Sequence, residues 1–121
     1  MAYENAIHAT YRFPAAPIDT DAVIGYIVGP EGKEGRLVSV GVVVTVTTAT
    51  NPTIIEVGIS GTVSKYGYCT VAAVTAPAAE NTDTISDTDD NQIPADSLVI
   101  VGSDGGAASG DGDVIVVIAW F

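Results

Sequence analysis

Val38-Ser39-Val40-Gly41-Val42-Val43-Val44-Thr45-Val46-Thr47 is the stretch that decides the fold. Successive side chains of a β-strand point to opposite faces of the sheet, so residues at alternate positions share one face. The alternating valines are Val38, Val40, Val42, Val44 and Val46. Because a strand keeps its apolar residues on the buried side, the pattern predicts a half-buried strand with all five valines in a core.

Outward from this stretch, further short apolar runs rich in β-branched residues alternate with turn-forming residues. Pro14 and Pro17 are expected to end the first strand, since proline cannot donate to a ladder, and 103–112 is expected to be a glycine-rich loop. The remaining strands are expected at 5–13, 22–28, 53–59, 62–74, 97–102 and 113–121. No run of good helix formers has a helical period. The sequence therefore predicts an all-β fold with almost no helix: a two-sheet β-sandwich of seven or eight strands, favouring a jelly roll over an immunoglobulin-like Greek key.

The length of 121 residues, with 47% hydrophobic residues, suits one domain with one core. We expect a single domain over 1–121, with an N-terminal arm at 1–4 and a long surface connection at 76–91. A short strand around 84–86 fits inside that connection. Residues 37–55 carry no charge, but their threonines, their Asn-Pro pair and their two-residue period predict strands rather than a membrane span.

The charge is strongly negative and unevenly distributed. All four basic residues lie within the first 65 positions, nine of the fifteen acids follow Lys65, and the formal net charge is −11. Nucleic-acid binding depends on Lys and Arg that neutralise phosphates. The composition therefore excludes nucleic acids and anionic membranes as direct partners.

Residues for catalysis or cofactor binding are sparse. His8 falls on the polar face of the first strand and has no expected partner, and Cys69 is expected to be a small buried apolar residue. Two acidic segments, 87–91 and 104–113, resemble calcium loops in composition alone, because neither has the glycine and glutamate of an EF-hand or a nine-residue repeat. We expect no enzymatic activity, no cofactor and no metal.

Two segments carry a resemblance to a known family. Thr53–Tyr68, TIIEVGISGTVSKYGY, is similar to a hairpin of small structural proteins of tailed bacteriophages. Ile93–Val101 together with Asp113–Phe121 looks like the C-terminal hairpin of the same proteins. The chain thus resembles the capsid decoration, or cement, proteins. The resemblance implies a jelly-roll protein on the outer surface of an icosahedral capsid, often a trimer, that binds the major capsid protein and stabilises contacts between its subunits.

Two other functions remain open at this point. A head-fibre or tail component would show the same sequence pattern. A carbohydrate- or receptor-binding β-module is a different class, since jelly rolls also host lectins. Sugar sites generally need exposed aromatic platforms, whereas Trp120 lies within the terminal strand and the tyrosines at 3, 66 and 68 lie near chain ends and turns.

The capsid contact is expected to use the basic residues, which would pair with an acidic shell. These are Arg12, Lys33, Arg36 and Lys65. The opposite arrangement, in which Glu31 and Glu34 meet a basic groove, stays open.

The C-terminal strand is apolar on both faces, because Val114, Val116, Ile118 and Trp120 alternate with a second apolar set. That second set is Ile115, Val117, Ala119 and Phe121. A sheet in a two-layer sandwich normally has one face in water, so we expect the second set to form the interface of a homotrimer. Alternatively, the 76–91 connection or residues 2–4 could cover it within one chain.

Overall fold

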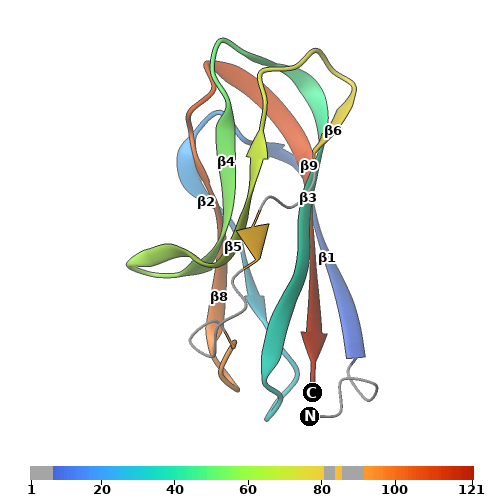
Figure 1. Cartoon of the computed structure of the whole chain (residues 1–121), viewed down its shortest axis with the longest axis vertical. Coiled ribbons are helices and arrows are strands. Elements are labelled where there is room, and N and C mark those ends of the chain that lie inside the picture. Colours follow the sequence, from blue (N-terminus) through green and yellow to red (C-terminus); the bar gives the residue numbers. More distant parts are fainter. Residues whose placement is uncertain (1–6, 81–83, 86–91) are drawn as a thin grey trace.

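The computed structural model describes residues 7–80, 84–85 and 92–121 and contains nine strands in these ranges. They form two antiparallel sheets that pack face to face (Figure 1). Sheet A has the order β1-β9-β3-β6, and sheet B has the order β2-β8-β4-β5-β7. The strands are β1 (Ile7–Pro17), β2 (Asp21–Val28), β3 (Gly35–Ala49), β4 (Thr53–Ile59), β5 (Thr62–Val71), β6 (Ala78–Glu80), β7 (Thr84–Ile85), β8 (Leu98–Asp104) and β9 (Ser109–Trp120).

The pairing shows that the sandwich is a jelly roll. Strands near the start of the chain pair with strands near its end: β1 with β9, β2 with β8, β3 with β6 and β4 with β5. The same pairing would arise if one long hairpin were folded over into two layers. Consecutive strands such as β1 and β2 therefore lie in opposite sheets. The predicted all-β jelly-roll sandwich is confirmed. Strand β7 adds a fifth strand to the edge of sheet B, and β6 and β7 both lie within 76–91.

The core lies between the sheets. From sheet A it receives Val40, Val42 and Val44 of β3 and the inner residues of β9, and from sheet B it receives the inner residues of β4 and β8. These inner residues are Val114, Val116, Ile118, Ile55, Val57, Val99 and Val101, all fully buried. Cys69 is also buried, as predicted. The apolar alternation of the sequence therefore supplies both walls of one core.

The expectation that all five alternating valines enter the core was wrong at both ends of β3. Val38 is 40% exposed and Val46 is 48% exposed. The register between β3 and β9 shifts between Leu37 and Ser39 and again between Val44 and Val46. Each irregularity inserts a residue into one strand, and a one-residue slip moves the following side chains to the other face.

Three further boundaries differ from the sequence prediction. Strand β1 does not end at Phe13 but continues to Pro17 through a register shift between Phe13 and Ala16. Prolines are tolerated there because β1 is an edge strand. The glycine-rich loop is short, since β8 runs to Asp104 and β9 already begins at Ser109. Strands β8 and β9 also do not form the expected C-terminal hairpin, because they lie in different sheets.

In the part of the chain that the structure describes, no helix is long and apolar enough to cross a membrane.

Candidate interaction surfaces

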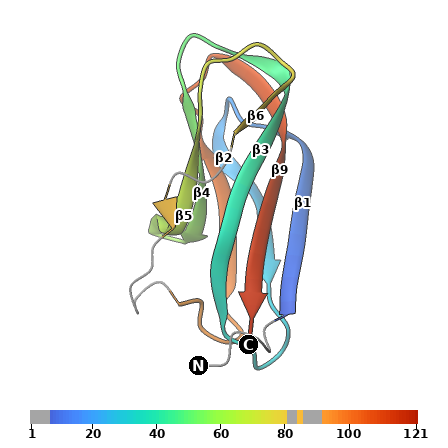
Figure 2. The ribbon, with the colours of Figure 1, turned by 45° about the vertical axis from the view of Figure 1, so that its right-hand side comes forward.

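The four apolar residues predicted as an oligomer interface lie along the central strand of sheet A. Figure 2 shows β9 between β1 and β3, with the outer face of this sheet toward the viewer. We call these residues the β9 strip: Ile115, Val117, Ala119 and Phe121. Ile115, Val117 and Phe121 are half-buried, and Ala119 is only 5% exposed. Neighbouring strands therefore already cover part of the strip.

The register shows which side chains flank the β9 strip. On the β1 side, His8, Thr10 and Arg12 lie opposite Ala119, Val117 and Ile115. On the β3 side, the corresponding partners are Arg36, Ser39 and Gly41. Residues directly opposite each other in an antiparallel pair share a face. The strip therefore runs between basic and small polar side chains, and His8 is exposed on this face, as predicted.

A hollow of about 200 Å³ opens beside the strip on the same face. Gly41 has no side chain to fill the space between Ser39 and Val43, and β6 closes the far side. The lining residues are Ser39, Gly41, Val42, Val43, Ala79, Glu80 and Ile115. This face thus combines an apolar strip with a concave apolar site.

The four predicted capsid-contact residues do not gather at one place. Arg12 and Arg36 share the outer face of sheet A, because they lie opposite Ile115 and Ala119 of the strip. Lys33 is exposed in the turn between β2 and β3, together with Glu31 and Glu34, and Lys65 lies on β5 of the other sheet. The Nε of Arg36 is buried and finds no hydrogen-bond acceptor within the described ranges.

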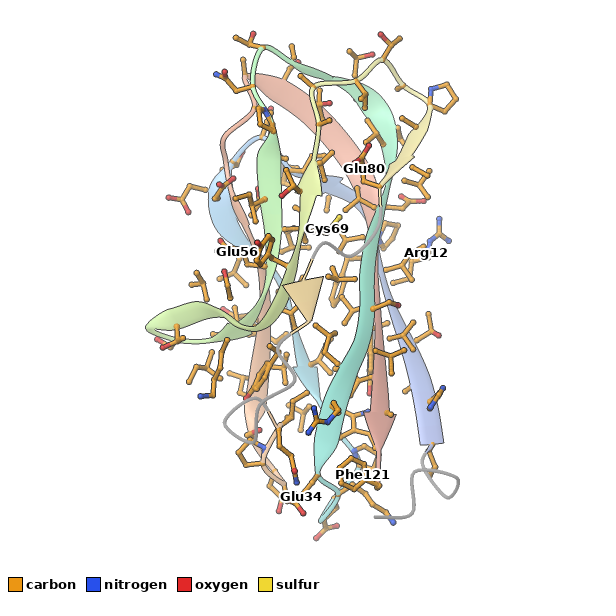
Figure 3. All side chains as sticks on the ribbon, viewed as in Figure 1. Arg12, Glu34, Glu56, Cys69, Glu80 and Phe121 are labelled. Atoms are coloured by element: carbon orange, nitrogen blue, oxygen red, sulfur yellow. The ribbon has the colours of Figure 1, made fainter. Side chains whose placement is uncertain are left out.

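Arg12 is held in place by an ion pair. Its guanidinium lies 2.5 Å from the Asp113 carboxylate, which also accepts a hydrogen bond of 2.9 Å from the Ala15 backbone N–H. The Ala15 hydrogen bond, together with the hydrogen bond and the charge of Arg12, lowers the pKa of Asp113 below its ordinary value. The Arg12 side chain is nevertheless 62% exposed, and Figure 3 shows it pointing away from the sandwich.

A second apolar surface, which the sequence interpretation missed, lies on the outer face of sheet B. Val28 lies opposite Leu98 and Tyr26 opposite Ile100 in the β2–β8 ladder, and Val23 lies beyond them. We call these residues the β2/β8 patch: Val23, Tyr26, Val28, Leu98 and Ile100. Tyr26 is 60% exposed and Val28 64% exposed. The signal was present in the sequence, because Val23–Val28, like the C-terminal strand, is apolar at both odd and even positions.

The β2/β8 patch borders a hollow of about 160 Å³. The hairpin that joins β4 to β5 projects from the sandwich (Figure 1), and its Val63 lines this hollow. The other lining residues are Asp21, Ala22, Val23, Glu56, Ile100, Gly102 and Ser103. The rim therefore carries two carboxylates and no basic side chain.

The acidic segment 104–113 has a structural role at two of its carboxylates. Asp104 Oδ1 accepts hydrogen bonds from the backbone N–H groups of Ile54 and Gly106, at 2.9 and 3.0 Å, and from the Thr53 hydroxyl at 3.0 Å. Asp113 is bound by Arg12 and Ala15 as described above. No group of three or more metal-ligating side chains occurs among the residues that the structure describes. The other acidic segment, 87–91, lies outside them.

Comparison with known proteins gives no family assignment. No family model matches the chain, and no curated protein matches it. Among solved structures, a chain of the capsid of Ralstonia phage GP4 is similar to this chain. The alignment covers 96% of this chain and 83% of the phage chain, at 19% sequence identity and a TM-score of 0.47. A chain of the capsid asymmetric unit of cyanophage Pam1 is also similar. That alignment covers 96% of this chain and 84% of the phage chain, at 20% sequence identity and a TM-score of 0.41. At these values neither alignment assigns a family or a function to this chain.

Proposed function

We propose that the chain is a non-enzymatic structural protein of a tailed-phage virion, a decoration protein that binds the outer surface of an icosahedral capsid. It would stabilise contacts between subunits of the major capsid protein. The observation that carries this proposal is the presence of apolar side chains on both outer faces of the sandwich. An antiparallel sheet in a two-layer protein normally turns a polar face to water, and a large exposed apolar patch usually marks an interface.

Two interaction surfaces on one small domain suit a protein that joins neighbouring subunits. The β9 strip would contact further copies of the chain, and Arg12, Arg36 and Lys33 would contact an acidic shell, whereas Lys65 lies on β5 of the other sheet and apart from that contact. Since Arg12 and Arg36 flank the strip, they would lie at the boundary between the two contacts. The kind of partner follows from the sequence resemblance of Thr53–Tyr68, which forms the β4–β5 hairpin with both strands paired.

The acidity of the chain supports the outer surface as its location. With fifteen acids and four basic residues, the chain would be repelled by packaged DNA if it lined the inside of a shell. Burying roughly 1,200–2,000 Å² per contact, the usual size of a specific interface, would add stability across the seams between capsid subunits.

The test is binding to particles. The phage that encodes the chain is grown, its virions are purified on a density gradient, and shells prepared without the chain are incubated with the purified protein. We expect the chain in stoichiometric amounts in the virions, saturable binding to the bare shells and a higher temperature of shell disruption after binding. Absence from purified virions would overturn the proposal.

A carbohydrate-binding module is the second candidate, and one observation favours it. Tyr26 presents an exposed aromatic ring beside a hollow that Asp21 and Glu56 line. It is not one of the tyrosines at 3, 66 and 68 that lie near chain ends and turns. A glycan array with a reproducible hit that Tyr26→Ala abolishes would favour this function over shell binding.

A further inference from the structure

Strand β2 is an open edge of sheet B, whereas the other edge strands are short or interrupted. Strand β1 carries two prolines and a register shift, β6 has three residues and β7 has two. In the described part of the chain β2 pairs with β8 alone, and residues 22–28 contain no charge and no proline. An edge strand exposes a row of unpaired N–H and C=O groups, and proteins usually block such an edge with charges or prolines. This stretch of β2 has neither.

The regular part of this edge is the segment 25–29, which we call the β2 edge. A register shift of β2 precedes it, and Pro30, which has no N–H to donate, follows it. Tyr26 and Val28 point to the outer face and are 60% and 64% exposed, more than any other large hydrophobic residue in the described ranges. Ile27 points the other way and is buried in the core. The β2 edge is therefore centred on Ile27.

A strand added at β2 needs cover on both of its faces, because its alternate side chains point to opposite sides of the sheet. A free peptide would leave the side chains of its inner face uncovered beside the margin of the core. The β2 edge of a second copy already has its inner side chain, Ile27, buried in its own sandwich. Only Tyr26 and Val28 then need new contacts. The added strand should thus belong to a folded sandwich, and a second copy of the chain supplies one.

The β2 edge is complementary to itself. If two copies are related by a two-fold axis and their β2 edges run antiparallel, Ile27 lies opposite the second copy's Ile27. Tyr26 then lies opposite the second copy's Val28, and Val28 lies opposite its Tyr26. Aromatic and β-branched side chains that face each other in this way stabilise a strand pair. A contact about a two-fold axis is also the commonest kind in homo-oligomers.

The charge of β2 itself does not oppose this pairing. Asp21 is the one charged residue of the strand and lies six positions before Ile27. In a pairing centred on Ile27, the two copies of Asp21 lie at opposite ends, about 40 Å apart at a rise of about 3.3 Å per residue. Salt screens charges at such a separation, since the Debye length is about 8 Å. The net charge of −11 still repels whole chains, so we expect pairing only well above micromolar concentration.

We propose that two copies of the chain pair edge to edge through β2, which joins their B sheets into one continuous sheet across a two-fold axis. The β9 strip lies on the outer face of sheet A, so one chain can use both contacts. The inference does not depend on the proposed function, because no shell takes part in it.

Sedimentation equilibrium from micromolar to millimolar concentration tests the pairing. The chain carries Val117→Asp, which removes association through the β9 strip. We expect the mass to rise from one chain to two and no further, because a two-fold contact closes on itself. Adding Val28→Glu should weaken this association by about ten-fold or more, since the pairing would bury a carboxylate against an apolar side chain.

Leu98→Glu is the matched control for Val28→Glu. Leu98 lies opposite Val28 on the same outer face, but on β8, one strand further from the edge. It should leave the association unchanged. A mass of one chain at every concentration would overturn the proposal. Equal losses for the two variants would also overturn it, because they would mean that the outer faces pack together rather than the edges.

Complementary charges test the register of the pairing. One variant of the Val117→Asp chain carries Tyr26→Lys and Val28→Lys, and the other carries Tyr26→Glu and Val28→Glu. Each alone should stay monomeric, because like charges directly opposite each other destabilise a strand pair. An equal mixture should form a heterodimer that weakens between about 50 and 500 mM salt. If the mixture does not associate, the proposed pairing of residue 26 with residue 28 is wrong.

Hydrogen exchange of the unmodified chain supplies a measurement that needs no substitution. Raising the concentration into the millimolar range should slow the exchange of those amides of the β2 edge that point away from β8. Face-to-face packing would leave these amides without a hydrogen-bond acceptor. If their exchange does not slow with concentration, the proposal fails, whatever Val117→Asp does to the fold.

Discussion

Trp120 closes one end of the sandwich, and two glycines make room for it. A Cβ atom placed on Gly29 would lie 2.4 Å from the indole ring, and one placed on Gly35 would lie 2.6 Å from it. The ring is buried, and its N–H donates a 3.0 Å hydrogen bond to the Tyr11 hydroxyl, as a buried tryptophan requires. Glycines as frequent as those of 29–35 are typical of turns. At these two positions their role is close packing against an aromatic ring.

Gly35→Ala should therefore destabilise the fold by about 1–3 kcal/mol, the usual cost of overpacking a tight core. The new methyl group would press on a ring that has no room to move away. Chemical denaturation of the variant measures the loss. The control is the double variant Gly35→Ala with Trp120→Leu, in which the smaller side chain leaves space for the methyl group. If the two losses were additive, the proposed clash would not be their cause.

The Asp113 carboxylate should make the stability of the fold depend on pH. Its pKa is lowered by the Ala15 N–H and by Arg12, so the folded state prefers the ionised form. The stabilisation of the folded state by this ionised carboxylate is complete well above the ordinary carboxyl pKa of 3.8. It is lost as the pH falls through the lowered pKa of the folded state. Asp113→Asn should thus lower the melting temperature at pH 7, and the difference from the unmodified chain should shrink at acidic pH.

Thermal melts between pH 2 and pH 8 check this prediction. Asp21→Asn, at an exposed position outside this hydrogen-bond network, is the control and should shift the melting temperature less. A melting-temperature gap between Asp113→Asn and the unmodified chain that stays constant, or grows toward acidic pH, would contradict the assigned role of the carboxylate.

At the scale of the strands, the sequence predicted where β3 lies but not where its register shifts. The period of two identified the strand and its buried centre, because Val40, Val42 and Val44 do face the core. The two bulges are set by pairing with β9, which is about 70 residues away in the chain. A local pattern contains no information about such a partner. The same limit explains β1, whose prolines are compatible with a strand only because it lies at an edge.

A pair of isosteric substitutions tests the second bulge. Val44→Thr places a hydroxyl at a fully buried position and should cost about 1–3 kcal/mol, since a buried hydroxyl without a partner keeps its desolvation penalty. Val46→Thr changes a side chain that is 48% exposed and should stay within about 0.5 kcal/mol. Urea denaturation measures both. Equal losses would mean that the strict alternation continues and that the register shift is absent in solution.

At the scale of the whole molecule, the sequence predicted the fold class and one of the two apolar outer faces. The β9 strip could be predicted because the C-terminal strand is apolar on both faces. A two-layer sandwich buries only one face of each sheet in its core, so the other apolar face must lie on the outside. The β2/β8 patch carries the same signal in a shorter run, and it becomes a surface only because Leu98 and Ile100 lie beside Val28 and Tyr26. The basic residues could not be grouped from the sequence, since chain order does not reveal which strands share a sheet.

The β9 strip leads to the prediction that the chain is a homotrimer. Val117 lies at the middle of the strip, between Thr10 and Ser39, and is half-buried by them. What remains exposed is continuous with the apolar hollow at Gly41 and with Val43, which is 39% exposed. An aspartate at 117 would place a charge at the centre of this surface, where burial against another copy would cost its hydration. Because the side chain points outward, the monomer should still fold.

Multi-angle light scattering at micromolar concentration should give a mass about three times the 12.3 kDa of one chain. Val117→Asp and Phe121→Asp should each reduce it to that of one chain and leave the β-sheet circular dichroism signal unchanged. Thr62→Asp, at the exposed tip of the β4–β5 hairpin, is the matched control and should remain trimeric. A mass of one chain for the unmodified protein would refute the trimer. It would mean that side chains within the chain, including those of β1 and β3 along the strip, cover enough of this face for a monomer to be soluble.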